Sequence, residues 1–289
     1  MILITGATGQ LGKAVANYLL AENATGLAVF VRDTSKVQDL TEKGVEVRVG
    51  SYDDYNSMLV AFKGVDKLYF VSGSDIEKRT KQHENVVKAA KEAGVGHIVY
   101  TSFIRNDETE KSPISMVARS HIKAEEWIKE SGMNYTILRH NIYMDMIPMF
   151  IGDQVLETGV IYLPAGETKV AFTLRDDMAL AGVRVLLTEG HENKVYDITN
   201  ESAVTFSEIA SGISRLTGKA VNYVSPSTEE YIKTLTTAGV PIEFAGFYAG
   251  FAEAFKLGEF SLTNKQFEIL TGRKPVSVDQ FLAQVYSAK

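Results

Sequence analysis

Short apolar runs alternate with longer amphipathic segments along the first half of the chain. The predicted strands are 1–5, 27–31, 45–49, 67–71, 97–101 and 135–138, and the predicted helices are 11–22, 35–43, 54–62, 77–93 and 115–129. Three of these helices end before Gly44, Gly64 and Gly94, each followed by valine, as expected where a helix C-cap leads into a strand. The strands are nearly all apolar, which is typical of strands buried on both faces. The alternation predicts an α/β fold with a Rossmann-type, doubly wound parallel sheet.

The pattern changes after about Tyr143. Strand patterns at 194–199 and 220–224 lie among helices, and the end of the chain is rich in helices. The predicted helices there are 228–238, 243–257, 264–270 and 278–286. We therefore predict a Rossmann domain over 1–145 and a smaller, mixed, helix-rich C-terminal subdomain over 146–289, some segments of which return to the Rossmann sheet. A ligand cleft is expected between the two parts.

Composition and charge narrow the classes of function. Apolar residues make up 45% of the 289 residues and charged residues 23%, as in a globular protein, and there is no cysteine to form a disulfide or a thiolate nucleophile. The net charge is −6 without a basic stripe, so we expect no nucleic-acid partner. No apolar run is long enough for a membrane span and no basic leader precedes the first strand, so a cytoplasmic location is expected. His121 and Glu125 share a helix face but lack a third ligand, so no metal is expected.

A glycine-rich turn is the most specific motif in the chain. It follows the first strand and opens the first helix, with glycines in the spacing G-x-x-G-x-x-G. In a Rossmann unit such a turn lets the backbone approach a pyrophosphate, and the helix N-terminus offers it free N–H groups. The predicted phosphate-binding residues are Gly6, Thr8, Gly9, Gln10, Leu11 and Gly12.

The residues after the second strand set the choice of cofactor. An acidic residue there would hold the ribose hydroxyls of NAD, whereas an arginine suits the 2′-phosphate of NADP. Arg32 comes first off the strand and Lys36 follows one helical turn later, which favours NADPH over NADH. Asp33 has two interpretations, since it could pair with Arg32 or cap a helix at Ser35.

Taken with Arg32, the glycine-rich turn resembles the extended and atypical short-chain dehydrogenase/reductases. The similarity is greatest to the NmrA-like branch, particularly its NADPH-dependent quinone oxidoreductases and triphenylmethane reductases, through the segments Gln82-His83-x-Asn85-Val86 and Gly190-His191-Glu192-Asn193-Lys194. The resemblance implies further cofactor contacts, at Ser51, Tyr52, Ser72, Gly73, Thr101, Ser102, His121 and Asn141. Ser51 stands where relatives usually carry an acidic residue.

The chain departs from the superfamily at its catalytic pair. Oxidoreductases and sugar epimerases of this group use Tyr-x-x-x-Lys, in which the tyrosine exchanges a proton with the substrate. Val117 takes the tyrosine position and His121 the lysine position, and the motif occurs nowhere else in the chain. His121 could supply a late proton or hold the ribose, or it could pack beside the cofactor with no chemical role. Tyr143 could stack on a flat acceptor or belong to the core.

Three functions are compared on these features. The first is an NADPH-dependent reductase of quinones or similar planar, electron-poor acceptors, which need no strong acid because the reduced product is a stabilised anion or a neutral dye. The second is a non-catalytic NmrA-like sensor of NADP(H). The third, an NDP-sugar epimerase-like protein, is disfavoured because the catalytic tyrosine is missing. For the reductase, we predict His121 and Tyr143 as the catalytic residues. Its partner is expected to be a small-molecule acceptor, a quinone or a dye-like compound. A homodimer is left open.

Overall fold

A computed structural model describes residues 1–287, and its centre is a parallel sheet of seven strands. The strand order is β3-β2-β1-β4-β5-β6-β8. The strands are β1 (Ile2–Thr5), β2 (Leu27–Val31), β3 (Glu46–Val49), β4 (Lys67–Phe70), β5 (His97–Phe103), β6 (Asn134–His140) and β8 (Lys194–Ile198). The order reverses between β1 and β4, so the crevice expected of a doubly wound sheet lies at their carboxyl ends. The predicted Rossmann-type sheet is confirmed.

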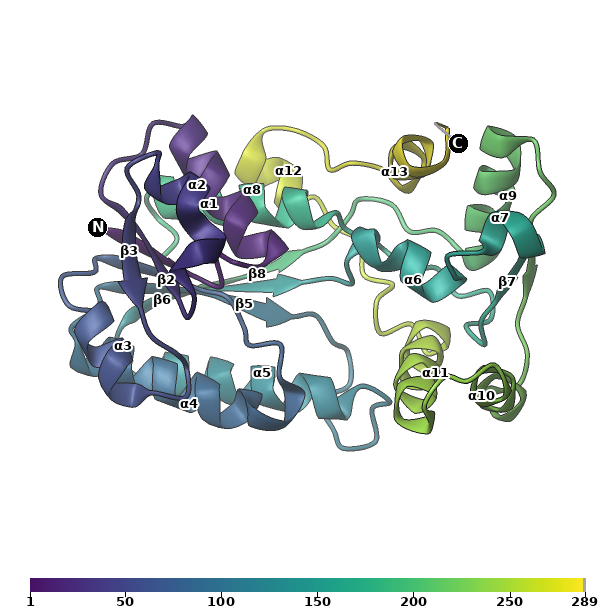
Figure 1. The fold of residues 1–289 in the computed structure, drawn as a ribbon, viewed down its shortest axis with the longest axis horizontal. Helices are drawn as coiled ribbons and strands as arrows, with labels where there is room; N and C mark the ends of the chain where they lie inside the picture. The colour runs from purple at the N-terminus through teal and green to yellow at the C-terminus, as the bar shows by residue number, and fades with distance from the viewer. Residues whose placement is uncertain (288–289) are drawn as a thin grey trace.

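Helices cover both faces of this sheet (Figure 1). On one face lie α1 (Gln10–Ala21), α8 (Arg175–Leu187) and α12 (Gln266–Thr271), which pack against one another over a core that includes Val15, Val29 and Leu138. On the other face lie α3 (Tyr55–Ala61), α4 (Ile76–Glu92) and α5 (Ser115–Glu130), over a core that includes Phe62, Phe70 and Ile137. The five inner strands, β1, β2, β4, β5 and β6, therefore bury alternate residues in two separate cores, which explains why they are mostly apolar. The edge strands β3 and β8 are more exposed and carry charged residues.

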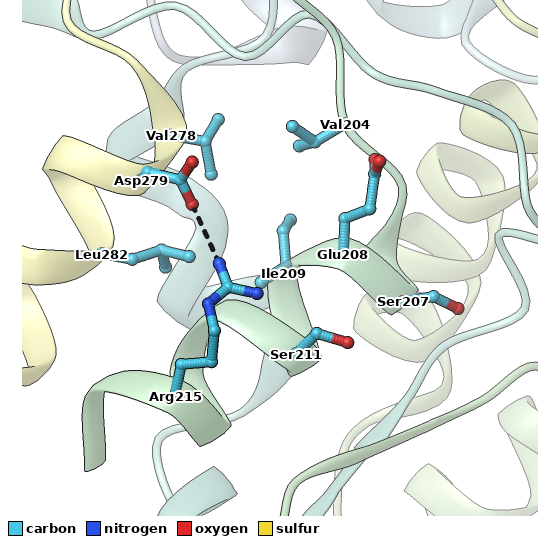
Figure 2. Close-up of a pocket in the computed structure, with 9 residues that line it drawn as sticks. All are labelled: Val204, Ser207, Glu208, Ile209, Ser211, Arg215, Val278, Asp279 and Leu282. Atoms are coloured by element: carbon cyan, nitrogen blue, oxygen red, sulfur yellow. Dashed lines mark ion pairs between the residues drawn. The ribbon is translucent and has the colours of Figure 1, made fainter. Parts of the chain in front are cut away.

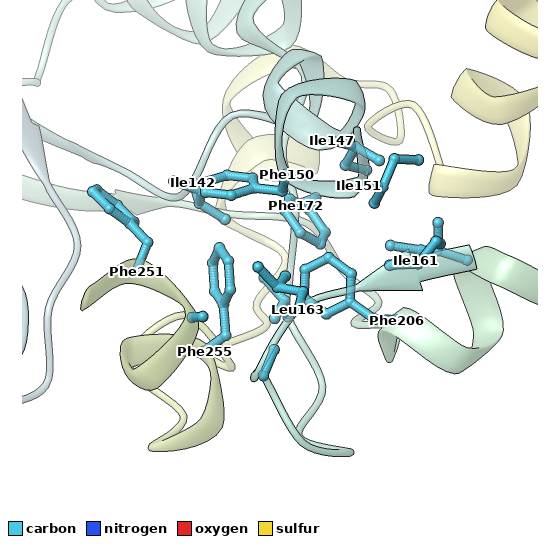
Figure 3. Close-up of a cluster of buried hydrophobic side chains, with 14 of the residues drawn as sticks. Ile142, Ile147, Phe150, Ile151, Ile161, Leu163, Phe172, Phe206, Phe251 and Phe255 are labelled. Atoms are coloured by element: carbon cyan, nitrogen blue, oxygen red, sulfur yellow. The ribbon is translucent and has the colours of Figure 1, made fainter. Parts of the chain in front are cut away.

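The remaining elements form the C-terminal part. Its strands β7 (Val160–Tyr162) and β9 (Asn222–Val224) pair in parallel. Its helices are α6 (Ile147–Ile151), α7 (Val155–Thr158), α9 (Phe206–Thr217), α10 (Thr228–Thr237), α11 (Ile242–Lys256) and α13 (Val278–Tyr286). Their shared core is rich in aromatic rings (Figure 3). Phe251 and Phe255 of α11 point into it, whereas Phe244 is 59% exposed, so core packing accounts for only part of this aromatic helix.

Several elements differ from the sequence prediction, since β7, α6, α7, α8 and α9 have no counterpart among the predicted ranges. The helix predicted at 35–43 is split into a 3₁₀ turn, η1 (Thr34–Val37), and a short helix, α2 (Gln38–Thr41), at Val37, whose φ of −130° is not helical. The Asp33 carboxylate caps the turn by accepting from the Ser35 N–H at 3.0 Å. A second 3₁₀ turn, η2 (Met144–Met146), follows β6. The chain also passes from the C-terminal part back to the sheet, since β8 pairs with β6 and α8 and α12 pack on that face.

Candidate functional site

The glycine-rich turn leaves the first peptide groups of α1 open at the carboxyl edge of the sheet. The Gly9 N–H donates to the Gly6 carbonyl at 2.9 Å, and Gly6 has a φ of +66° that favours glycine. A Cβ at Gly12 would lie 2.5 Å from the Gly6 oxygen, so the turn itself requires that glycine. A Cβ at Gly9 would meet only this oxygen, at 3.4 Å, so the fold has room there. Gly9 also caps α1 without a side chain, which leaves the N–H groups of the helix for an anionic ligand.

A cavity of about 530 Å³ extends from this turn across the ends of the first four strands. Most of the predicted site residues line it, namely Gly6, Thr8, Gly9, Gln10, Leu11, Gly12, Arg32, Ser51, Tyr52, Ser72, Gly73 and Tyr143. The other lining residues are not among those predicted from the sequence: Phe30, Val31, Gly50, Asp53, Val71, Ser74, Asp75, Lys78, Gln82 and Arg175. The cavity thus collects residues from seven segments of the chain around one edge of the sheet.

The cationic side chain of Arg32 lies at the end of the cavity beside β2. Arg32 is exposed and makes no ion pair with any of residues 1–287. Asp33, which could have neutralised it, instead accepts from the N–H and the hydroxyl of Ser35, and these hydrogen bonds lower the pKa of its carboxyl. Arg32 is therefore free to meet a phosphate.

Tyr52 fixes the wall of the cavity between β1 and β4. Its hydroxyl contacts Thr5 Oγ1 at 2.5 Å and donates to the Val71 carbonyl at 2.8 Å. Burial raises the pKa of this phenol, so it stays protonated as a donor. Nearby, the Gln82 amide donates to Asp53 Oδ1 at 3.1 Å, a polar pair that sequence reasoning missed because the two residues lie on different elements.

The backbone after β4 is held by side chains behind it. The Ser72 N–H donates to Thr101 Oγ1 at 3.0 Å, and the Gly73 N–H donates to His83 Nε2 at 3.1 Å. A Cβ at Gly73 would lie 2.7 Å from Oε1 of Gln82, so a larger residue there would displace the Gln82 side chain. Thr101 thus supports the cavity wall without lining it.

Tyr143, which follows β6, and Arg175, the first residue of α8, close the cavity. The Arg175 guanidinium carbon lies 4.3 Å from the centre of the Tyr143 ring, in cation–π geometry. Arg175 also contacts the Gln10 side chain in the glycine-rich turn and pairs with Asp145 at 3.8 Å. No local motif marks Arg175 as a site residue, since it is simply the first residue of α8.

His121 lies behind the cavity in a buried polar cluster. It is 4% exposed, its Nδ1 lies 2.8 Å from the Tyr100 hydroxyl, and the Phe103 ring stacks on it. Burial, followed by the charge of Arg79, holds the pKa of His121 well below its usual value, so the imidazole is neutral at pH 7. Val117, at the position of the missing tyrosine, is a buried apolar residue.

Other predicted contacts are engaged within the protein. The Ser102 hydroxyl donates to Glu125 at 2.6 Å, and the Asn141 amide donates to Thr199 Oγ1 at 2.7 Å. Lys36 is exposed outside the cavity lining. Direct cofactor contacts by Lys36, Thr101, Ser102, His121 and Asn141 stay predictions.

A second cavity, of about 320 Å³, lies between α9 and α13 (Figure 2). Its lining combines four aliphatic side chains with two serines and three charged residues. Its charged pair, Arg215 and Asp279 at 3.6 Å, is exposed to solvent. None of the predicted site residues lines it. Within residues 1–287, no three His, Cys, Asp or Glu side chains gather as metal ligands. No helix in the same range is long and apolar enough to cross a membrane.

Comparison with known proteins identifies relatives that match over most of the chain. The model of the NmrA-like family matches residues 1–282. Quinone oxidoreductase 2 of Escherichia coli (strain K12) is 38% identical over 242 residues, which cover 83% of each chain.

Two solved structures also match nearly the whole length of the chain. The crystal structure of an NADPH-dependent quinone oxidoreductase from Escherichia coli in complex with NADPH superposes with a TM-score of 0.92 at 34% identity, covering 99% of this chain and 100% of that one. The Citrobacter sp. triphenylmethane reductase in complex with NADP(H) gives 0.90 at 38% identity, covering 98% and 99%.

Proposed function

The chain belongs to the NmrA-like family, and from this premise we propose that it is an NADPH-dependent reductase of quinones and similar planar, electron-poor acceptors. The observation that carries the proposal is the cavity at the carboxyl edge of the sheet. It joins a glycine turn, an unpaired arginine and an aromatic residue in one continuous space. Relatives that align over nearly the whole chain are named for this cofactor and these acceptors.

The cavity has the features that hold such a dinucleotide. The α1 N-terminus and Gly9 suit the pyrophosphate, because Gly9 lacks a side chain where the fold would accept one. Arg32 is placed for the 2′-phosphate, and an arginine fork can bind it through two hydrogen bonds. Ser51 and Asp53 line the adenosine end, and Tyr143 the opposite one. The bound cofactor would supply a hydride, and the protein supplies position and electrostatics.

No side chain at the tyrosine position can donate a proton. Val117 is apolar, and His121, one helical turn further along α5, is neutral at pH 7. Such a site suits acceptors that take a hydride without simultaneous protonation, because quinone reduction gives a stabilised anion. It does not suit sugar epimerisation, which needs a proton carrier. We assign His121 a supporting role and Tyr143 the role of stacking on the flat acceptor.

The experiment is NADPH oxidation, followed by absorbance, with a panel of quinones, triphenylmethane and azo dyes, and sugar nucleotides. Turnover with a quinone and none with sugar nucleotides is expected. Tight NADPH binding without oxidation by any planar acceptor in stopped-flow experiments would contradict the proposal and favour the redox-sensor hypothesis.

The proposal extends to the acceptor class, the cellular location and the assembly. We propose a small-molecule acceptor and a cytoplasmic location, and treat a homodimer as the assembly to test. Light scattering over a range of concentrations distinguishes a dimer from a monomer, and a fluorescent fusion reports the location.

A further inference from the structure

Arg79, on α4, is a buried cation that has no acidic partner. Its side chain is 6% exposed; Nε donates to the Ser120 hydroxyl at 2.7 Å and Nη2 to the Val117 carbonyl at 2.8 Å. Both acceptors are neutral. Within residues 1–287, no carboxylate oxygen lies within 4.0 Å of its guanidinium.

This arrangement contrasts with the other buried arginine near the site. Arg105, 8% exposed, lies 2.9 Å from Glu125 and 2.8 Å from Glu108. Burying a charge costs free energy unless the charge is paired. Arg105 is paired with two carboxylates in the usual way, whereas Arg79 is bound only to neutral acceptors. An anion that arrives during the reaction would complete the pairing of Arg79.

One nitrogen of Arg79 remains available for such an anion. Nη1 has no hydrogen-bond partner among the described residues. It keeps some access to solvent, because it is not one of the fully buried atoms that lack a partner. The guanidinium is thus held by two of its nitrogens while the third can still donate.

Arg79 lies directly behind the cavity wall at Gly73, although it is not itself among the residues that line the cavity. Its Cγ lies 3.7 Å from where a Cβ of Gly73 would be, and Gly73 and the preceding Lys78 both line the cofactor cavity. Its anchor is the carbonyl of Val117, the residue at the family's tyrosine position. Burial is the main cause that lowers the pKa of both His83 and His121, and the positive charge of Arg79 is the second. The charge of Arg79 therefore acts on the groups at this end of the site.

We propose that Arg79 is a catalytic residue that stabilises the oxyanion formed on a carbonyl acceptor, and that the acceptors are neutral quinones rather than cationic dyes. This inference rests on the proposed function and narrows its substrate class. Reduction adds one hydride, with both electrons of the broken C4–H bond of NADPH, to the quinone. The products are NADP⁺ and the hydroquinone monoanion, which then takes a proton from water. Arg79 donates to the anionic oxygen, whereas a cationic dye would meet a like charge.

The first test compares Arg79→Gln with Arg79→Lys, using Lys81→Gln as control. Lys81 lies on the same helix but is exposed and paired with Glu84 at 2.9 Å, so its loss removes the same charge away from the site. Arg79→Gln should lower kcat for a benzoquinone by roughly 10²–10³-fold, the usual effect of losing one oxyanion donor. Arg79→Lys should recover part of the rate, and NADPH affinity should change less than about twofold in all three. An Arg79→Gln enzyme with wild-type kcat would overturn the inference.

Two measurements keep the inference testable if Arg79→Gln does not fold. The wild-type enzyme should have a higher kcat/KM for a neutral benzoquinone than for a cationic triphenylmethane dye, and the reverse order would contradict the role of Arg79. In the NADP⁺-loaded protein, 4-nitrophenolate should bind at least about tenfold more tightly than uncharged nitrobenzene, about the value of one charge-assisted hydrogen bond. Equal binding would also overturn the inference. Phenolate binding without any quinone turnover would instead refute the proposed function and leave the anion site in place.

Discussion

The Tyr100 hydroxyl lies between two buried imidazoles, 2.8 Å from Nδ1 of His121 and 3.3 Å from Nδ1 of His83. The Gly73 N–H donates to Nε2 of His83, and burial lowers the pKa of this ring to about 3, so its proton lies on Nδ1. Burial also holds the pKa of His121 well below its usual value. Tyr100 therefore links two uncharged rings behind the cavity.

Quinone reduction should therefore show no histidine titration near pH 6.5. The folded-state pKa of His121 lies well below 6.5, so the ring stays neutral from pH 6 upward. His121→Ala should slow the reaction by less than the roughly 10²–10⁴-fold expected for loss of a general acid. The measurement is kcat between about pH 5.5 and 8.5 for both proteins. A larger loss, confined to kcat and following a group that titrates near 6.5, would make His121 the proton donor.

Arg32→Ala should weaken NADPH binding by about 1.5–3 kcal/mol, the range for a hydrogen bond to a charged group, and leave NADH almost unchanged. Lys43→Ala serves as control, because Lys43 is an exposed cation outside the cavity. Lys36→Ala shows whether the second predicted cation also contributes. Calorimetric titration measures the affinity of each variant for each cofactor. Equal affinity of the wild-type protein for NADPH and NADH would rule out this role for Arg32.

Gly9→Val should abolish NADPH binding while leaving the fold intact. The φ of Gly9 is −94°, which valine adopts, and the only close atom to its Cβ is at 3.4 Å. The side chain would instead fill the place of the pyrophosphate. Gly12→Ala is the contrasting variant, because its Cβ would lie 2.5 Å from a backbone oxygen and should lower the Tm. Circular dichroism and fluorescence titration separate the two effects, and normal NADPH binding by Gly9→Val would place the phosphates elsewhere.

Glu125 should contribute to stability until the solution is strongly acidic. Burial by itself would raise its pKa, but hydrogen bonds from Arg139 and Arg105 hold the pKa at about 2. Because this folded-state value is below that of the unfolded chain, the contribution is present above about pH 4 and lost as the pH falls towards 2. Glu125→Gln should cost about 3–5 kcal/mol at pH 7, since it removes the buried carboxylate that Arg105 and Arg139 share.

Urea unfolding of both proteins at pH 7 and pH 3 measures this contribution. The difference between wild type and Glu125→Gln should shrink at the lower pH, and a difference that stays constant would contradict the assignment. Glu126→Gln is the control, because Glu126 is an exposed neighbour paired only with Lys123.

Local sequence patterns were sufficient for the first six strands and for the glycine turn. There the strand, the glycine spacing and the helix are contiguous, so neighbouring residues determine both the fold and the ligand geometry. The side chain of Asp54 caps α3, a contact within one short segment. Asp177, in the first turn of α8, is instead buried and accepts from Arg273 at 2.6 Å and from the Val276 N–H at 2.7 Å.

The residues that sequence analysis missed depend on packing between distant segments. Arg175 reaches the glycine turn across 165 positions of sequence, and Gln82 reaches Asp53 from another helix. Arg79 lies in an ordinary amphipathic helix, and only the absence of an acidic neighbour in three dimensions distinguishes it. No periodicity or spacing reports such a relationship, because it depends on which side chains the tertiary fold brings near.

The return of β8, α8 and α12 to the sheet limits how this protein can be recombined with its relatives. A chimera joined near residue 145 would exchange the edge strand beside β6 and two covering helices together with the C-terminal part. It would also exchange Arg175, which touches the glycine turn, so a graft meant to alter the acceptor would alter the cofactor cavity too. Acceptor preference in this architecture is therefore more readily changed by single substitutions at the cavity wall than by swapping whole segments.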